Sequence, residues 1–293
     1  MAIIQDWIPP TRENYETVLF YWQFWPVLAS IQWLISWYGM GKTSKASALN
    51  LPGRATWMAM ECPGFATLLY MVGTLPGARG IEDLPWQNKV LAALFVIHYA
   101  YRAVVFPLVA PSMAPMHAAI AAAAVLFQLC NGFCLGAWLG AYGPTTQVEW
   151  RDRLAPGGVA QFVAGMGIFY LGLTANYYHD EELREIRRRE ERRREKVARE
   201  QGNKGGAAQV ERHYAVPQAG FFKYLLFPHY FFEWVEWLGF WMACGWGCAP
   251  ARAFLVNEVA SMLPRAVRGK RWYVEKFGAE KIGRRKAVIP GVL

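Results

Sequence analysis

Ionisable side chains inside apolar runs are the first candidates for chemistry in this chain. Glu61 lies in the stretch WMAMECPG, and the stretch HYAYR carries His98, Tyr99 and Arg102. A charge within a long apolar run is costly and usually serves a function. Residues three or four apart share one side of a helix, so both His98 and Tyr99 can face the same way as Arg102. The spacing predicts a polar seam inside an otherwise apolar bundle.

Two further runs carry polar groups at a similar depth. The segment 176–180 (NYYHD) ends one of them, and PHYFFEWVEW in the other contains His229, Glu233 and Glu236. Their positions along the runs place them near the same inner half of the apolar layer as Glu61. We therefore expect these groups to lie at one level of the bundle.

The pair Glu61 and Tyr99 suggests one specific kind of chemistry. A carboxyl at that depth keeps its proton unless it is paired, because burial disfavours its charged form. A neutral Glu61 beside Tyr99 could hydrogen-bond a ketone and stabilise an enolate, since both groups would donate where negative charge develops. The spacing is equally consistent with a buried ion pair between Glu61 and Arg102, and the residues alone leave both interpretations open.

The elements that must hold these residues are helices long enough to cross a membrane. The chain has 293 residues, of which 54% are hydrophobic and 15% aromatic, a composition too apolar for a soluble domain of this length. A helix needs roughly 17–25 apolar residues to cross about 30 Å of hydrocarbon. Seven runs have that length: 17–39, 55–77, 87–109, 115–140, 158–178, 221–246 and 248–264. We predict an all-α, polytopic membrane protein that forms a single domain over 1–293, without a metal site.

The positive charge of the chain is concentrated on one side of the predicted membrane. The formal net charge is +9. With seven spans, the first loop, the segment 180–219 and the tail 265–286 carry the basic residues and lie on the same side. The positive-inside rule then places the C-terminus on the cytosolic or matrix side, in the endoplasmic reticulum or the mitochondrial inner membrane. This distribution points to a membrane surface and not to nucleic acid as the partner.

The segment Asp180–Arg212 forms an unusual charged arm. It contains EELREIRRREERRREKVARE, followed by QGNKGGAAQ. Charges of both signs at three- and four-residue spacing favour a solvated helix that continues the fifth run into water. A docking arm for a protein partner or for anionic lipid headgroups is the alternative.

Five stretches of the chain combine several specific patterns in a fixed order. They are LPGRATWMAMECPGF (51–65), NKVLAALFVIHYAYRAVVFPL (88–108), NYYHDEELREIR (176–187), YAVPQAGFFKYLLFPHYFFEWVEWLGF (214–240) and the tail RAVRGKRWYVEKFG with RRKAVIPGVL (265–293). Their patterns W-x-x-x-E-x-P, HYxxR and E-x-x-E-W-x-G, with a terminal IP, resemble the steroid 5α-reductases, the family of 3-oxo-5α-steroid 4-dehydrogenases. The resemblance covers most of residues 36–293.

The resemblance implies a seven-helix fold whose cavity takes NADPH from the cytosolic side and a flat, hydrophobic enone from the lipid. Hydride would pass to the β-carbon of the conjugated ketone. Glu61 and Tyr99 would hold and polarise the carbonyl, and Trp57 would line the pocket. Eight residues would contact or enclose the nucleotide: Arg102, Asn176, Asp180, Arg187, Tyr214, Glu233, Arg265 and Tyr273.

Several departures from the family pattern fall on the nucleotide side. The loop Ala110–Met116 lacks the family's arginine, His229 replaces an asparagine, and Gly269 replaces a histidine. An insertion at 188–212 separates two positions that the family keeps close in sequence. Two functions therefore remain open. The chain is either an NADPH-dependent reductase of a steroid or polyprenoid-like enone, or a reductase-like scaffold without catalysis that serves as an accessory subunit of a larger membrane complex, mitochondrial complexes included.

Overall fold

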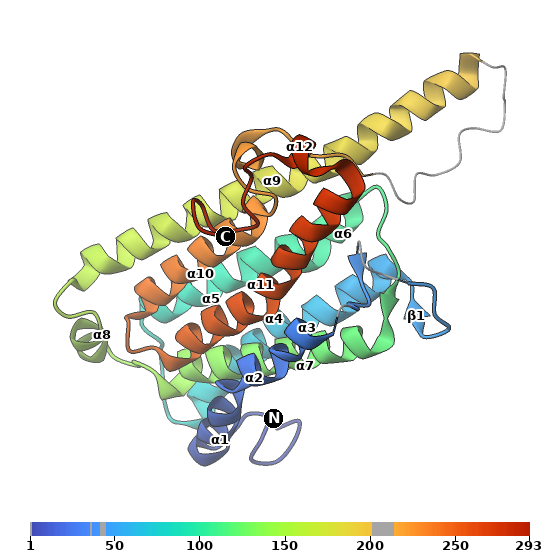
Figure 1. The fold of residues 1–293 in the computed structure, drawn as a ribbon. Coiled ribbons are helices and arrows are strands. Elements are labelled where there is room, and N and C mark those ends of the chain that lie inside the picture. The colour runs from blue at the N-terminus through green and yellow to red at the C-terminus, as the bar shows by residue number, and fades with distance from the viewer. Residues whose placement is uncertain (1, 36, 42–44, 201–213) are drawn as a thin grey trace.

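Figure 1 shows the computed structural model of the chain, which describes residues 2–35, 37–41, 45–200 and 214–293. It is a bundle of helices with one small sheet, so the expected all-α class is confirmed. The helices are α1 (Arg12–Trp22), α2 (Trp25–Ala29), α3 (Ile31–Leu34), α4 (Gly53–Ala78), α5 (Trp86–Tyr99), α6 (Phe106–Val109), α7 (Ala118–Ala137), α8 (Gln147–Arg153), α9 (Gly158–Glu200), α10 (Pro228–Cys244), α11 (Ala249–Phe277) and α12 (Ala279–Ile282). π-Helical turns follow α5 (Ala100–Val105) and α7 (Trp138–Tyr142), a 3₁₀ turn covers Gly220–Lys223, and strands β1 (Asn50–Leu51) and β2 (Met116–His117) pair antiparallel.

Four helical stretches are long and apolar enough to cross a membrane: Gly53–Ala78, Trp86–Val109, Ala118–Tyr142 and Gly158–Val197. They coincide with the second to fifth of the runs expected from the sequence. Since each is at least 24 residues long, each can span about 30 Å of hydrocarbon at 1.5 Å per residue. The protein is therefore an all-α polytopic membrane protein.

The first expected run, 17–39, is not a continuous helix. Helix α1 ends at Trp22, and two shorter helices, α2 and α3, follow it. Pro26 lies in the first turn of α2. Because proline has no N–H to donate to the preceding turn, the helix breaks before it. The broken segment turns Trp25 and Ile31 toward the cavity described below.

The last two expected runs, 221–246 and 248–264, become α10 and α11 with shifted bounds. Helix α10 starts only at Pro228, since proline favours the first turn of a helix, and it has 17 residues. Helix α11 continues past the end of its apolar run to Phe277, and its second half is rich in charged residues. The additional turns carry Arg265 and Tyr273 on the same helix as the apolar run.

Helix α9 has 43 residues, and its second half projects beyond the bundle (Figure 1). The expectation that the charged arm continues the fifth run as a helix is confirmed as far as Glu200, and residues 201–212 of the arm lie outside the described residues. Ion pairs follow this part of the helix, joining Arg189 to Glu185 and Arg193 to Glu190. An exposed pair such as that of Arg189 contributes about 0.2–1 kcal/mol.

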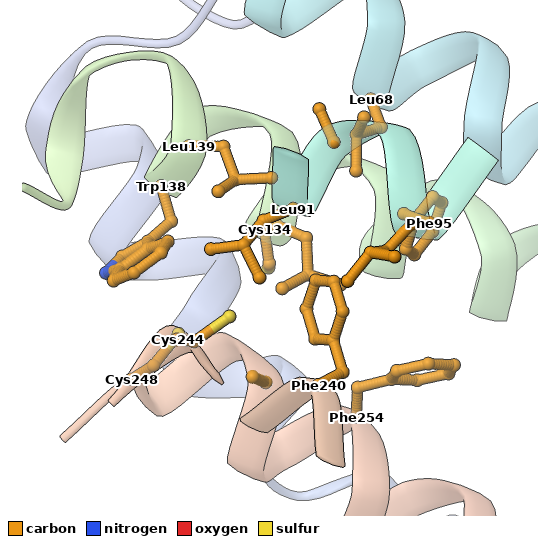
Figure 2. Packing of buried hydrophobic residues seen from close by; sticks show 14 of the residues in the cluster. Leu68, Leu91, Phe95, Cys134, Trp138, Leu139, Phe240, Cys244, Cys248 and Phe254 are labelled. Atoms are coloured by element: carbon orange, nitrogen blue, oxygen red, sulfur yellow. The ribbon is translucent and has the colours of Figure 1, made fainter. Parts of the chain in front are cut away.

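One hydrophobic core holds α4, α5, α7, α10 and α11 together (Figure 2). Side chains from all five helices meet there, among them Leu68, Phe95, Cys134, Phe240 and Phe254, and each of these is at most 1% exposed. The cysteine acts as a small apolar packing residue, as buried free thiols commonly do. The core fixes α5, which carries Tyr99, and α10, which carries Glu233, relative to each other.

Glycines allow two pairs of helices to approach closely. A Cβ atom at Gly132 of α7 would overlap the backbone oxygen of Gly64 on α4. A Cβ atom at Gly136 of α7 would lie 2.8 Å from a backbone atom of α4. Between α9 and α10, Gly172 and Gly239 have the same role, because a Cβ at either position would overlap backbone atoms of the other helix. Small residues at four-residue spacing commonly mediate such packing in membranes.

Gly132→Val should destabilise the protein by about 2–3 kcal/mol, because the new side chain forces α7 away from α4 and overpacking costs this much. The measurement is the free energy of unfolding in mixed detergent micelles. Gly73→Ala in α4 is the matched control, since a Cβ there meets no atom within 4 Å. Equal stability of the two variants would contradict the close approach of α4 and α7.

Candidate active site

An apolar cavity of about 400 Å³ opens between α2, α3, α4, α5, α7, α10 and α11. Its wall is mainly aromatic and aliphatic, and it includes Trp25, Trp57 and Phe127. A cavity of this size and polarity suits a drug-sized lipophilic ligand with few polar groups. Glu61 and Tyr99 both line it, so the two residues expected to hold a ketone face the same cavity.

Two amides of α7 hold Glu61 and Tyr99. Gln128 Nε2 donates to Glu61 Oε2 at 2.5 Å, and Asn131 Nδ2 donates to Tyr99 Oη at 3.4 Å. The amides are three residues apart and therefore share a helix face. The Tyr99 hydroxyl accepts this bond, so its own hydrogen stays available to donate to a ligand. One oxygen of Glu61 likewise remains for the cavity.

Arg102 forms its ion pairs with Asp180 and Glu233, at 3.0 and 3.6 Å. Among the described residues it forms no ion pair with Glu61, so the buried-pair interpretation of Glu61 is wrong. Arg102 lies in the π-helical turn, where its carbonyl accepts from Trp57 Nε1 at 3.0 Å and its guanidinium covers the Trp57 ring. π-Helical turns are frequent at functional sites because they reposition one residue within a helix.

Glu233 is the centre of a buried polar network that joins α5, α9 and α10. His98 lies 3.9 Å from one of its oxygens, and Asn176 Nδ2 donates to the other at 3.2 Å. His98 also bonds Glu236 through Nδ1 at 2.7 Å. The network holds Arg102 and Asn176 in place beside the cavity. Within the described ranges, no group of three His, Cys, Asp or Glu side chains is arranged to hold a metal ion.

A second cavity of about 270 Å³ adjoins the first, and the two share the wall residues Trp57, Arg102 and Arg265. Guanidinium groups are concentrated around it: Arg102, Arg184, Arg187, Arg265 and Arg268. Arginine matches phosphate oxygens in a bidentate geometry, so this arrangement suits a phosphorylated ligand. The lipophilic and the basic cavity thus meet at Trp57 and Arg102.

The loop Ala110–Met116, which lacks an arginine of its own, receives basic groups from two helices. Arg54 of α4 donates to the carbonyl of Ala110 at 2.7 Å, and Arg187 of α9 donates to that of Ser112 at 2.8 Å. Arg187 lines the second cavity together with part of this loop. The loop therefore lacks a basic residue of its own, but guanidinium groups from α4 and α9 contact it.

The packing around Gly269 leaves no room for the histidine that the family pattern has at this position. A Cβ at this position would overlap the ring of Phe227, which occupies the space that a larger side chain would need. Gly269, Phe227 and His229 all line the second cavity. An aromatic wall therefore stands where the family pattern has a histidine.

Nine of the eleven site residues expected from the sequence line one or both cavities: Trp57, Glu61, Tyr99, Arg102, Asp180, Arg187, Tyr214, Glu233 and Arg265. The other two lie beside them. Asn176 reaches the site through Glu233, and Tyr273 is buried against the rings of Phe227 and Trp272. Burial raises the pKa of the Tyr273 hydroxyl above its ordinary value. The role of each residue stays a prediction.

Five wall or support residues had not been expected from the sequence. Two of them, Gln128 and Asn131, are the amides that hold Glu61 and Tyr99, and they stand in the apolar stretch VLFQLCNGF, where a polar residue is a visible signal. Glu258 lines the first cavity, and Arg184 and Arg268 line the second. Arg184 and Arg268 lie in charged stretches, where spacing alone does not single them out, whereas Glu258 stands in the apolar stretch AFLVNEVASML and was a visible signal that sequence reasoning missed.

Comparison with known proteins gives one family for most of the chain. The family model described as 3-oxo-5-alpha-steroid 4-dehydrogenase matches residues 114–203 and 207–293. An uncharacterized protein of Schizosaccharomyces pombe is 33% identical over 85% of this chain and 89% of its own length. 3-oxo-5-alpha-steroid 4-dehydrogenase 1 of Bos taurus is 30% identical over 80% of this chain and 79% of its own length. Steroid 5-alpha-reductase DET2 of Arabidopsis thaliana is 30% identical over 80% of both chains.

Proposed function

The chain belongs to the 3-oxo-5-alpha-steroid 4-dehydrogenase family, and from this premise we propose that it is a membrane-embedded, NADPH-dependent reductase of a hydrophobic conjugated enone. The observation that carries the proposal is the junction of the two cavities. A lipophilic cavity with Glu61 and Tyr99 at its wall meets a cavity lined by guanidinium groups at Trp57 and Arg102. A steroid-like or polyprenoid-like enone fits the first, and a phosphorylated nucleotide fits the second.

The residues around the second cavity have unused polar atoms that fit a nucleotide. Arg184 Nη1 and Asn176 Oδ1 are buried, and neither has a hydrogen-bond partner among the described residues. Leaving such groups unpaired costs about 1–3 kcal/mol each, which a ligand that pairs with them would offset. Arg184, Arg187, Arg265 and Arg268 would hold phosphates, and Asn176 and Asp180 would bind the ribose or the nicotinamide. When bound, NADPH supplies the hydride.

Glu61 and Tyr99 would act on the carbonyl oxygen of the enone. Both would donate hydrogen bonds to it, which draws electron density from the β-carbon and stabilises the enolate that forms after reduction. Gln128 and Asn131 keep the two donors in place before the substrate binds. The apolar wall excludes water, so each of these hydrogen bonds is stronger than in solution.

The accessory-subunit alternative draws on the projecting half of α9 and on the departures at the nucleotide side. The contacts of Arg54 and Arg187 with the loop Ala110–Met116 favour the reductase. They bring guanidinium groups to the loop in which this chain lacks the arginine of the family pattern.

We propose that the protein lies in the endoplasmic reticulum membrane, with the basic C-terminal tail on the cytosolic side.

The experiment that tests the proposal is NADPH binding to the detergent-purified protein by calorimetry, with NADH as the comparison, followed by an assay of progesterone reduction. We expect micromolar binding that favours NADPH, because the second cavity has several guanidinium groups for phosphates. Absence of NADPH binding would contradict the reductase and favour the accessory role.

Arg184→Ala should weaken NADPH binding by about 10- to 100-fold, the equivalent of roughly 1.5–3 kcal/mol for one charge-assisted hydrogen bond. The measurement is the Kd by the same calorimetry. Arg189→Ala is the matched control on the same helix, because the Arg189 side chain is 65% exposed and pairs with Glu185 away from the cavities. An equal loss of NADPH affinity in both variants would point to a general effect on α9 and not to a contact between Arg184 and the ligand.

A further inference from the structure

Glu258 is a third carboxyl group in the lipophilic cavity, besides Glu61 and Glu233. It is partly buried on α11, in the segment Ala249–Phe277, and it makes no hydrogen bond or ion pair with any residue that the structure describes. The other two carboxyls have partners, Gln128 for Glu61 and Arg102 for Glu233. An unpaired acid in an apolar cavity calls for a functional explanation.

The surroundings of Glu258 place it near the reacting centre of the proposed reaction. It lines the lipophilic cavity together with Glu61, Tyr99 and Glu233. The cations in the same cavity wall are Arg102 and Arg265. Neighbouring carboxyls and a low-polarity wall both favour the protonated form of a carboxylic acid. Glu258 is therefore arranged to carry a proton.

The proposed reduction needs a proton at a place that Glu61 and Tyr99 do not serve. Hydride adds to the β-carbon, the electrons of the C=C bond move to the carbonyl oxygen, and the α-carbon must then take a proton to give the saturated ketone. Glu61 and Tyr99 come from α4 and α5 and hold the oxygen, in the plane of the enolate. The proton reaches the α-carbon from above or below that plane. It must therefore come from an acid on a different wall of the cavity from the one that carries Glu61 and Tyr99. Helix α11 forms such a wall.

We infer that Glu258 is a further catalytic residue, the acid that protonates the α-carbon of the enolate. The inference rests on the proposed function. In this step the O–H bond of Glu258 breaks, a C–H bond forms at the α-carbon, and the C=O bond is restored. Glu258 is left as a carboxylate and regains a proton from solvent. The overall balance is enone, NADPH and one proton giving saturated ketone and NADP⁺.

The test uses the reverse of this step, in which no hydride moves. The whole chain in detergent is incubated in deuterium oxide with the product that forms when the C=C bond of progesterone is reduced. Hydrogen exchange at the α-carbon that belonged to this C=C bond is followed by NMR. We expect the wild type to exchange one α-hydrogen stereospecifically, and Glu258→Gln to lose about 100-fold in rate, as removal of a general acid–base group does. Glu275→Gln, an exposed glutamate on the same helix, is the control and should exchange at the wild-type rate.

Progesterone reduction, measured in parallel, separates the two proposals. If the wild type reduces progesterone while Glu258→Gln exchanges the same hydrogen at an unchanged rate, the role of Glu258 is overturned and the reductase stands. Wild-type reduction without any stereospecific exchange would also overturn it, in favour of a proton from water. If the wild type reduces no enone, the proposed function itself fails.

Discussion

Glu61→Gln is expected to lower the turnover of enone reduction by about 100- to 1,000-fold, the loss that follows removal of one preorganised oxyanion donor. The substitution keeps the shape of the side chain, but the remaining amide is a weaker donor to a developing enolate than a protonated carboxyl. Gln128 still contacts residue 61, because it donates at 2.5 Å to an oxygen that glutamine retains. The protein should therefore fold, and the measurement is kcat with NADPH and progesterone.

Two comparisons isolate the effect of Glu61 on the reaction. Glu82→Gln, at an exposed glutamate between α4 and α5, should turn over like the wild type. The Kd for NADPH should be unchanged in Glu61→Gln, since residue 61 lines the lipophilic cavity and not the basic one. Turnover within about twofold of the wild type would remove Glu61 from the mechanism, given the size of donor effects elsewhere.

Most of the helical framework was predictable because its signals are local. The spans beginning at Gly53, Trp86, Ala118 and Gly158 each contain enough consecutive apolar residues to cross a membrane, and composition alone identifies such runs. The first run contains as many apolar residues, but the helix ends at Trp22, before Pro26, because proline cannot donate to the preceding turn.

The partners of Glu61 and Arg102 were not predictable because they depend on long-range packing. Spacing along α4 and α5 permitted a pair between these two residues. The observed partners of Arg102, Asp180 and Glu233, come from α9 and α10, and glycines such as Gly172, which faces the backbone of Glu236, allow these two helices to approach each other closely. A single glycine in an apolar run does not reveal which helix it will face.

Arg102→Met should destabilise the folded protein by about 3–5 kcal/mol, because it leaves the buried carboxylates of Asp180 and Glu233 without their cation. Methionine fills most of the volume of the arginine side chain, so the lost stability comes mainly from the missing positive charge. The measurement is the free energy of unfolding in mixed detergent micelles. Arg151→Met, at an exposed arginine of α8, is the control and should change this free energy by less than about 0.5 kcal/mol.

The double variant Arg102→Met with Asp180→Asn decides whether charge is the cause. If the cost comes from uncompensated carboxylates, neutralising Asp180 should make the double variant more stable than Arg102→Met alone, although Glu233 still lacks its cation. A double variant that is less stable than Arg102→Met would show that contacts of Arg102 with Trp57 and Phe106 dominate instead. NADPH binding should be lost in both variants, since Arg102 stands where the two cavities meet and its guanidinium lines both of them.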